Sequence, residues 1–529
     1  MTKREHDPAQ PGIGTIDRRG FMTRAAALGA VSAAGVPLIG GQVRAATPQK
    51  GGVCHFGVGS GSTSDSLDPA KITDNFMQLV NFGLRNCLTE VSTSGALIPE
   101  LAESFEGSDS ARVWTFELRK GVTFHNGKTL RAEDVIASID HHRGDKSESA
   151  AKDILEPVES IKADGPHTVV FTLKQGNADF PFLLSDYHLT IMPVTDDGLD
   201  VLSGVGTGGY LLEEFEPGVR CRLKRNPDYW KEAAAHFDAV EVLAIKDSTA
   251  RTNALTTGEI DVMNRVDPKT ASLVARRSNL RVEETSGNQQ YTFPMHTDKA
   301  PFKDNNVRMA LKLAMDRQDI LDKVLGGHGY LGNDHPIGKA NHFHADGLPQ
   351  RNYDPDKAKH HLKKAGAENL KIQLHTSDAA FVGAVDAAAL FQEQARAAGI
   401  EIDVKRAPSD GYWSNVWLKE PFCMSYWSGR PTADWMFQVG YAAGASWNAT
   451  NWAHERFNKL LQEARIELDQ SKRREMYVEM QQLCRDEGGV IIPMFANYIM
   501  ALNDRLAHNQ MANNADLDGR RAIERWWFA

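Results

Sequence analysis

A strand–helix–strand pattern between residues 371 and 405 is the feature that most constrains the fold. Residues 371–374 and 400–404 alternate polar and apolar side chains, as half-buried strands do. Between them, an Ala-rich stretch from Ala384 to Ala398 is typical of a helix, and Gly399 ends it. Two strands joined by a helix pair in parallel, because a parallel pairing needs a long crossover. The pattern therefore predicts a mixed α/β fold with helices on the faces of a sheet.

Other segments extend this prediction. Alternation predicts strands over 114–119 and 219–224, and the apolar run 490–492 predicts a third. Amphipathic spacing predicts one helix over 457–468 and a second that Asp469 or Ser471 caps and that continues through Cys484. A chain of 529 residues has room for about three domains.

Charge and cysteine content exclude several classes of protein. The 60 Lys and Arg residues face 69 Asp and Glu residues, a net charge of -9. This acidic excess gives no general attraction to nucleic acid, so no nucleic-acid partner is expected. The five cysteines are too few for a disulfide framework, and their odd number leaves at least one unpaired. Whether any two of them pair stays open.

The first 45 residues read as an export signal. Residues 17–22 form a twin-arginine pattern, and an apolar stretch from Ala25 to Gly41 follows. Small residues end this segment, so cleavage after about Ala45 is expected. No other segment approaches 18 uninterrupted apolar residues, the length of a membrane span. The sequence therefore predicts a soluble mature protein in a bacterial periplasm, exported by the twin-arginine pathway.

No motif for catalysis is present. The sequence has no GxSxG elbow, Walker loop or HExxH helix, and the glycine-rich stretch 204–209 lacks the Lys-Ser/Thr of a phosphate loop. The histidine pairs at 141–142, 342/344 and 360–361 lack the i,i+4 spacing of a helical metal site. We therefore expect no enzyme activity, no cofactor and no metal site.

Aromatic residues are concentrated between residues 412 and 452. The same stretch is rich in Gly, Ser, Pro, Thr and Asn, which are typical of loops. Aromatic side chains on loops, beside a cation such as Arg430, suit a concave site for a small molecule. Trp427 and Trp435 could equally well fill a core, and the sequence leaves both interpretations open.

Several motifs resemble a known family. The most specific lie at 101–105, 114–122, 124–127 and 132–135. Further matches occur at 66–69, 206–210, 225–230, 255–262 and 314–317. With these motifs the chain resembles the family 5 extracellular solute-binding proteins of bacterial ABC importers, the dipeptide, oligopeptide and nickel type. The resemblance runs from about Gly51 to beyond Pro493.

The resemblance implies a fold and a domain plan. The fold would be a bilobed α/β clamshell of the two-crossover type with an additional α/β domain. Lobe I would comprise 46–80, 193–288 and 506–529, the extra domain 81–192, and lobe II 289–505. A monomer would hold its ligand in the cleft between the lobes and deliver it, chemically unchanged, to an ABC transporter permease in the inner membrane.

The resemblance also implies which residues bind the ligand. In peptide-binding relatives an Asp shortly after a pocket Trp pairs with the ligand's ammonium group, but here Arg430 occupies that place. A guanidinium suits a carboxylate, so the hypothesis is a solute with at least one carboxylate: a peptide, a modified peptide or an opine-like conjugate. An alternative role for Arg430 is to pair with Asp434 or another carboxylate and so to shape the loop. The candidate site residues are Tyr426, Trp427, Arg430, Asp434, Trp435 and His296, although His296 could instead stabilise a hinge strand.

Other interpretations remain open. Sugar rings pack well on indole faces, so an oligosaccharide is a serious alternative ligand, and an anionic metal chelate is another. Less favoured is a periplasmic signalling or chaperone-like protein that reuses the same fold. A secreted hydrolase would need a catalytic pair that the sequence does not offer.

Overall fold

The computed structural model describes residues 47–145, 147–149, 151–381, 383–408 and 412–529. The export signal predicted for residues 1–45 lies outside this range. The described residues belong to one compact unit, residues 45–529. In this part of the chain, no helix has both the length and the apolar character that crossing a bilayer requires.

The largest sheet is mixed. Its strands follow the order β10-β11-β12-β1-β13-β19-β14-β18, and β15 also pairs with β19. β1 pairs in parallel with β12 and β13, whereas the other pairs are antiparallel. The strands are β1 (Val53–Val58), β10 (Tyr210–Glu216), β11 (Arg220–Arg225), β12 (Ala239–Ala244), β13 (Val262–Met263), β14 (Leu280–Pro294), β15 (Gly329–Leu331), β18 (Ser425–Trp427) and β19 (Val490–Asn503).

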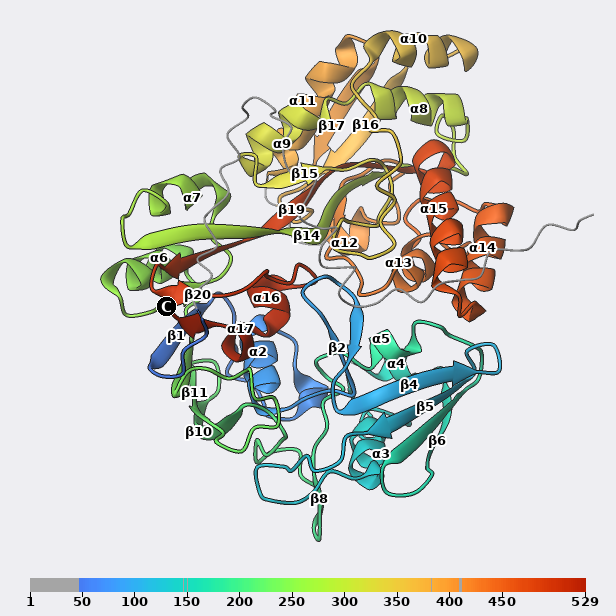
Figure 1. Cartoon of the computed structure of the whole chain (residues 1–529). Helices are drawn as coiled ribbons and strands as arrows, with labels where there is room; N and C mark the ends of the chain where they lie inside the picture. Colours follow the sequence, from blue (N-terminus) through green and yellow to red (C-terminus); the bar gives the residue numbers. More distant parts are fainter. Residues whose placement is uncertain (1–46, 146, 150, 382, 409–411) are drawn as a thin grey trace, which may run out of the picture. The chain divides into compact units, whose positions relative to one another are not determined.

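The two long strands β14 and β19 connect one group of elements, near α7, with another, near β15 and α9 (Figure 1). They have 15 and 14 residues and pair antiparallel over most of their length. The end of β19 pairs with β13, and its first half pairs with β15. β19 is buried over 490–495 and 499–502, which explains the apolar residues in these two stretches. These strands are the two crossovers that the family resemblance implies.

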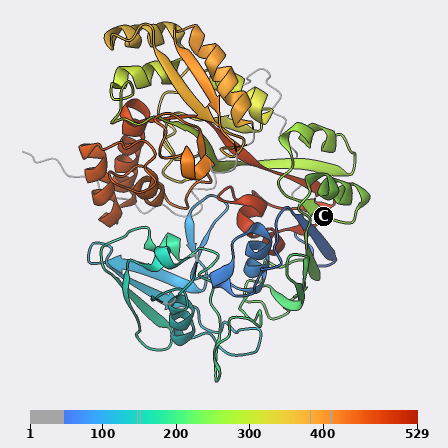
Figure 2. The ribbon, with the colours of Figure 1, turned by 180° about the vertical axis from the view of Figure 1, so that it is seen from behind.

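A separate antiparallel sheet has the order β4-β5-β7-β6. Alternate residues of β5 and β7 are buried, so one face of each strand packs on a core. Helix α3 covers this sheet, as the view from behind also shows (Figure 2). The strand predicted at 114–119 is confirmed as β5. The elements are β4 (Ala102–Ser108), β5 (Val113–Leu118), α3 (Ala132–Asp140), α4 (Lys152–Leu155), β6 (Val158–Ala163), β7 (Thr168–Leu173) and α5 (Phe180–Leu183).

The predicted strand–helix–strand unit is confirmed. β16 (Lys371–Thr376) and β17 (Glu401–Arg406) pair in parallel, and α11 (Ala384–Arg396) connects them. The buried residues of α11 include Ala387, Ala388 and Phe391, which join the core beneath the strands. The small alanine side chains let the helix pack closely against the sheet.

Three consecutive helices position the site described below: α13 (Ala433–Gly440), α14 (Glu455–Ile466) and α15 (Gln470–Glu487). The hydroxyl of Thr432 accepts a hydrogen bond from the Trp435 N–H and so caps α13. Asp469 caps α15 by accepting from the N–H groups of Ser471 and Lys472, as the sequence predicts. α13 packs on α14, and α14 packs on α15.

The remaining elements complete the fold. The remaining helices are α2 (Asn75–Leu84), α6 (Ser248–Thr257), α7 (Pro268–Val274), α8 (Asn305–Leu313), α9 (Arg317–Leu325), α10 (Pro355–Lys364), α12 (Tyr412–Asn415), α16 (Asp516–Arg520) and α17 (Ala522–Arg525). The short strands are β2 (Thr89–Val91), β3 (Leu97–Pro99), β8 (Val194–Thr195), β9 (Gly198–Leu199), β20 (Leu506–Ala507) and β21 (Trp527–Phe528).

Candidate functional site

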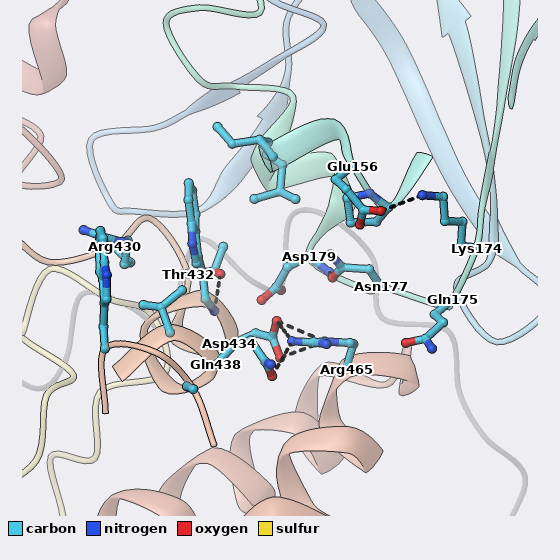
Figure 3. A pocket seen from close by; sticks show the side chains of 18 of the residues that line it. Glu156, Lys174, Gln175, Asn177, Asp179, Arg430, Thr432, Asp434, Gln438 and Arg465 are labelled. Carbon is cyan, nitrogen blue, oxygen red and sulfur yellow. Dashed lines mark hydrogen bonds and ion pairs between the residues drawn. The ribbon is translucent and has the colours of Figure 1, made fainter. Parts of the chain in front are cut away.

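A cavity of about 760 Å³ lies between two stretches that are far apart in the sequence. One wall comes from residues 154–183 and the other from residues 430–465. In the boundaries that the resemblance implies, these stretches belong to the extra domain and to lobe II. Figure 3 shows Asp179 on the first wall facing Asp434 and Arg465 on the second, while Glu156 and Lys174 point toward each other. A volume of this size suits a small organic ligand.

Arg430 lines the cavity from the loop between β18 and α13. Its guanidinium carbon lies 5.1 Å from the ring centre of Trp427 and 5.8 Å from those of Trp435 and Trp447. Its Nη1 donates to the Gly429 carbonyl at 2.8 Å. No carboxylate of the described residues lies within ion-pair distance of it. Burial lowers the pKa of Arg430, yet the guanidinium remains protonated at neutral pH.

Asp434 faces the cavity but is already paired. Its carboxylate accepts from Nη2 of Arg465 at 2.9 Å and from Nε at 3.2 Å. Burial raises the pKa of Asp434, while Arg465 acts in the opposite direction. Arg465 also donates to the side-chain oxygen of Gln438 at 3.1 Å. The alternative interpretation, in which Arg430 pairs with Asp434, is therefore wrong in this structure: Asp434 has a different partner.

The opposite wall contributes Asp179, Lys174 and Glu156. Asp179 Oδ1 accepts from Nη2 of Arg473 at 2.5 Å, and both side chains are buried. The other oxygen, Oδ2, is enclosed and has no hydrogen-bond partner among the described residues. Lys174 pairs with Glu156 at 2.6 Å, at the exposed rim.

The aromatic residues divide between this cavity and the core. Trp435 lines the cavity and also packs against the apolar core formed by residues 88–191. Trp447 lines the cavity and is 46% exposed. Trp427 is buried behind them, with its ring 5.8 Å from that of Trp447. Trp427 therefore supports the wall of the cavity and does not line it.

Two predicted site residues lie elsewhere. Tyr426 precedes Trp427 on β18, so its side chain points to the opposite face of the strand, where it is exposed and meets Trp413 edge-on. His296 follows β14 and is buried, its backbone N–H donating to the Pro421 carbonyl at 2.8 Å. Neither residue lines the cavity. Arg430, Asp434 and Trp435 are the predicted residues that the structure brings together there.

The charged residues that complete the cavity are not among those predicted from the sequence. No local motif marks them, because their partners come from distant helices and loops. They are Glu156, Lys174, Asp179, Arg465 and Arg473.

A second cluster of charged side chains lies outside the cavity, where three distant parts of the chain meet. Three carboxylates, those of Glu90, Glu100 and Glu524, are close enough to share an ion. Lys231 Nζ lies 2.7 Å from Glu90 and 2.8 Å from each of the other two, so protein cations already neutralise them. We call this group the junction cluster: Glu90, Glu100, Lys231, Arg521, Glu524 and Arg525.

The cysteines and the glycine-rich stretch have structural environments. All five cysteines lie in the described part of the chain; each is buried and free, so none forms a disulfide. In the glycine-rich stretch, a Cβ at Gly206 would lie 2.2 Å from the Leu84 carbonyl oxygen. Gly206 and Gly208 therefore allow close packing against the end of α2.

Comparison with known proteins identifies the family. The model for "Bacterial extracellular solute-binding proteins, family 5 Middle" matches residues 96–449, a range that contains most of both cavity walls. The chain belongs to this family. The family consists of substrate-binding proteins of ABC importers and not of enzymes.

Curated relatives and solved structures agree. This family 5 protein is 26% identical to di/tripeptide-binding protein 1 of Pseudomonas aeruginosa, over 85% of this chain and 90% of the relative. It is 27% identical to the dipeptide-binding protein of Escherichia coli, over 81% and 85% of the two chains. The structure of HbpA2 from Haemophilus parasuis has the same fold, with a TM-score of 0.79 at 21% identity, covering 88% of this chain and 99% of the other. We conclude that the protein has the bilobed fold of its family and a solute-binding role alongside an ABC transporter permease.

Proposed function

We propose that this family 5 protein binds a small, carboxylate-bearing solute in the 760 Å³ cavity and delivers it unchanged to its importer. Arg430 carries the proposal, because it is a half-buried cation on the cavity wall with no carboxylate partner among the described residues. A guanidinium on the cavity wall suits a planar anion, which it can hold through two parallel hydrogen bonds.

The relatives support a peptide-like solute. The curated names of two relatives are di/tripeptide-binding and dipeptide-binding protein. A peptide carries a carboxylate at its C-terminus, which Arg430 could hold. A charge-assisted hydrogen bond of this kind contributes about 1.5–3 kcal/mol, or about one to two decades of affinity.

Calorimetric titration tests this role of Arg430. Peptides, N-modified peptides and other small carboxylates are titrated into the wild type and into Arg430→Ala. We expect at least one compound to bind the wild type and to lose about tenfold or more in affinity in the variant. Arg406→Ala is the matched control, since Arg406 pairs with Asp378 on the surface at 2.8 Å and lies outside the cavity. Equal affinity of every bound compound for Arg430→Ala and wild type would contradict the proposal.

An oligosaccharide is the second candidate. The 46% exposure of Trp447 and the position of Trp435 on the cavity wall favour it, because indole faces stack well on sugar rings. A sugar ligand would depend on Trp447 and Trp435 more strongly than on Arg430. Titration of neutral oligosaccharides into Trp447→Ala and Arg430→Ala separates the two candidates.

We also propose that residues 1–45 direct export to the periplasm by the twin-arginine pathway, as the paired arginines Arg18 and Arg19 suggest. Replacing both by Lys should retain the precursor in the cytoplasm. Appearance of the mature protein in the periplasm at the wild-type level would contradict this route.

The domain plan remains a proposal, with one adjustment. A separate apolar core formed by residues 88–191 supports an extra domain at 81–192. α2 extends from Asn75 to Leu84, and Leu84 packs with the core that contains β1. We therefore propose that the first boundary falls after Leu84. The boundary near 288 divides β14, as expected for a crossover strand.

A further inference from the structure

The charges that line the cavity balance, but the set has one excess positive charge once Arg473, the buried partner of Asp179, is counted with it. Six charged side chains line it: Glu156, Lys174, Asp179, Arg430, Asp434 and Arg465. Five of them have an opposite partner: Lys174 with Glu156, Arg465 with Asp434, and Asp179 with the buried Arg473. Arg430 has none among the described residues. The six lining residues and Arg473 together therefore carry one uncompensated positive charge.

Neither buried acid is available to an ammonium group. Asp434 is held by two nitrogens of Arg465, which Gln438 holds in turn. An ammonium would have to displace this guanidinium and leave it unpaired in a mostly buried place, which is costly. The side chain of Asp434 is only 7% exposed, so access is also restricted.

Asp179 is enclosed in a similar way. Arg473 occupies one oxygen, and the other has almost no accessible surface. The adjacent N–H of Ala178 donates to the Arg465 carbonyl at 2.7 Å, which ties the two walls together beside the carboxylate. A solute in the cavity therefore cannot reach Asp179 without separating the walls.

The remaining acid, Glu156, is at the exposed rim and paired with Lys174. Water screens such a pair and would equally screen its attraction for a solute ammonium. Arg430 itself repels an ammonium. The nearby indole rings lie 5.1–5.8 Å from the Arg430 guanidinium, whose positive charge opposes a cation–π contact between these rings and an ammonium.

On the basis of the proposed function, we propose that the cavity selects anionic solutes without a free amine. Such solutes are N-acylated amino acids or peptides, or other amine-free carboxylates. A free dipeptide has a carboxylate that Arg430 can hold, but it must bury an ammonium for which no acceptor is open. Acylation of the amine removes that cost and leaves the carboxylate unchanged. Arg430 is then a specificity-determining residue that favours one class of acid over the zwitterion.

Three matched probes test the inference in the purified full-length protein by calorimetry: Ala-Phe, N-acetyl-Ala-Phe and the neutral N-acetyl-Ala-Phe amide. We expect the N-acetyl acid to bind about tenfold or more tightly than the free dipeptide, and the neutral amide to bind weakly. Arg430→Gln should weaken the N-acetyl acid about tenfold or more and remove the preference. Arg430→Lys should keep the preference, because it keeps the charge, while binding less tightly than wild type.

The outcomes separate this inference from the proposed function. If Ala-Phe binds as tightly as its acetylated form and Arg430→Gln weakens both, the inference is overturned and the role of Arg430 as a carboxylate contact stands. If the neutral amide binds as tightly as the acid, the proposed function fails as well. Binding of none of the probes overturns the inference, because its simplest member is then not recognised. Arg406→Gln serves as the control and should match the wild type throughout.

Discussion

The junction cluster and the cavity differ in how their charges are compensated. In the junction cluster every charge has an opposite partner, and Lys231 alone contacts three carboxylates. Burial lowers the pKa of Lys231, but the carboxylates outweigh it and raise that pKa well above its usual value. At the cavity Arg430 has aromatic neighbours but no ion-pair partner among the described residues. A fully paired buried cluster indicates a structural role, whereas an unpaired cation on a cavity wall indicates a place for a ligand anion.

Replacing one arginine by Met in the junction cluster and one in the cavity should separate the two roles. Arg521→Met, in the junction cluster, should have the largest effect on stability. Arg521 is buried and lies 2.7 Å from Glu100 and 3.0 Å from Glu524. Its removal leaves buried carboxylates without compensation, so we expect a loss of about 3–5 kcal/mol in the free energy of unfolding. Denaturant unfolding measures this loss. Arg456 pairs with Glu479 on the surface, so Arg456→Met should change stability by less than about 0.5 kcal/mol. An equal loss in both variants would contradict a special role for the junction cluster.

Acidification should reduce stability through a different set of buried groups. Burial lowers the pKa of His142 and of His335 to about 3, from an ordinary 6.5. Between pH 3 and pH 6.5 the unfolded chain binds more protons at these histidines than the folded protein does. Their contribution to the free energy of unfolding is therefore complete above about pH 6.5 and is lost as the pH falls. Each histidine should contribute a slope of about 1.4 kcal/mol per pH unit below pH 6.5.

Denaturant unfolding as a function of pH measures that slope. His335→Gln removes one of the histidines that the fold holds neutral, so its stability should fall less steeply than that of the wild type between about pH 6 and pH 5. Identical slopes would mean that His335 is not held neutral in the folded protein.

Arg430→Met should give the reverse of Arg521→Met. We expect a loss of about 1.5–3 kcal/mol in binding free energy for the carboxylate that binds the wild type most tightly. Stability should change by less than about 1 kcal/mol, because no ion pair is broken. Titration and denaturant unfolding of the same preparation measure both quantities. A large loss of stability without a loss of affinity would mean that Arg430 has a structural role like that of the junction cluster.

Trp447→Ala should have the smallest effect of this series. Trp447 is one of three rings beside Arg430 and is largely exposed, so its loss removes one cation–π contact. We expect about 0.5–1 kcal/mol of lost affinity and little change in stability. An effect larger than that of Arg430→Met would favour the oligosaccharide candidate instead.

The sequence predicts the regular parts of this fold well. Alternation at 114–119 and the unit at 371–405 correspond to β5 and to β16, α11 and β17, because each pattern reflects burial of one face. The predicted strand at 490–492 is only the beginning of β19, which ends at Asn503. Both faces of that strand are buried, so no alternation marks its length.

Part of the lining of the candidate cavity can be predicted from the sequence, for a physical reason. Arg430, Asp434 and Trp435 lie on one loop and the first turn of one helix, so local sequence groups them. The partner that neutralises Asp434, Arg465, comes from the next helix, and Asp179 comes from a different part of the chain. Which charge is paired depends on side-chain distances across these elements. Spacing in the sequence does not contain that information.

Mass spectrometry of the solute that co-purifies with the protein tests the central claim most directly. Wild type and Arg430→Gln are purified in parallel, and the solutes released by denaturation are identified. The account predicts an intact carboxylate-bearing compound that the wild type retains and the variant loses. Equal retention by both proteins, or a retained solute without an acidic group, would contradict it.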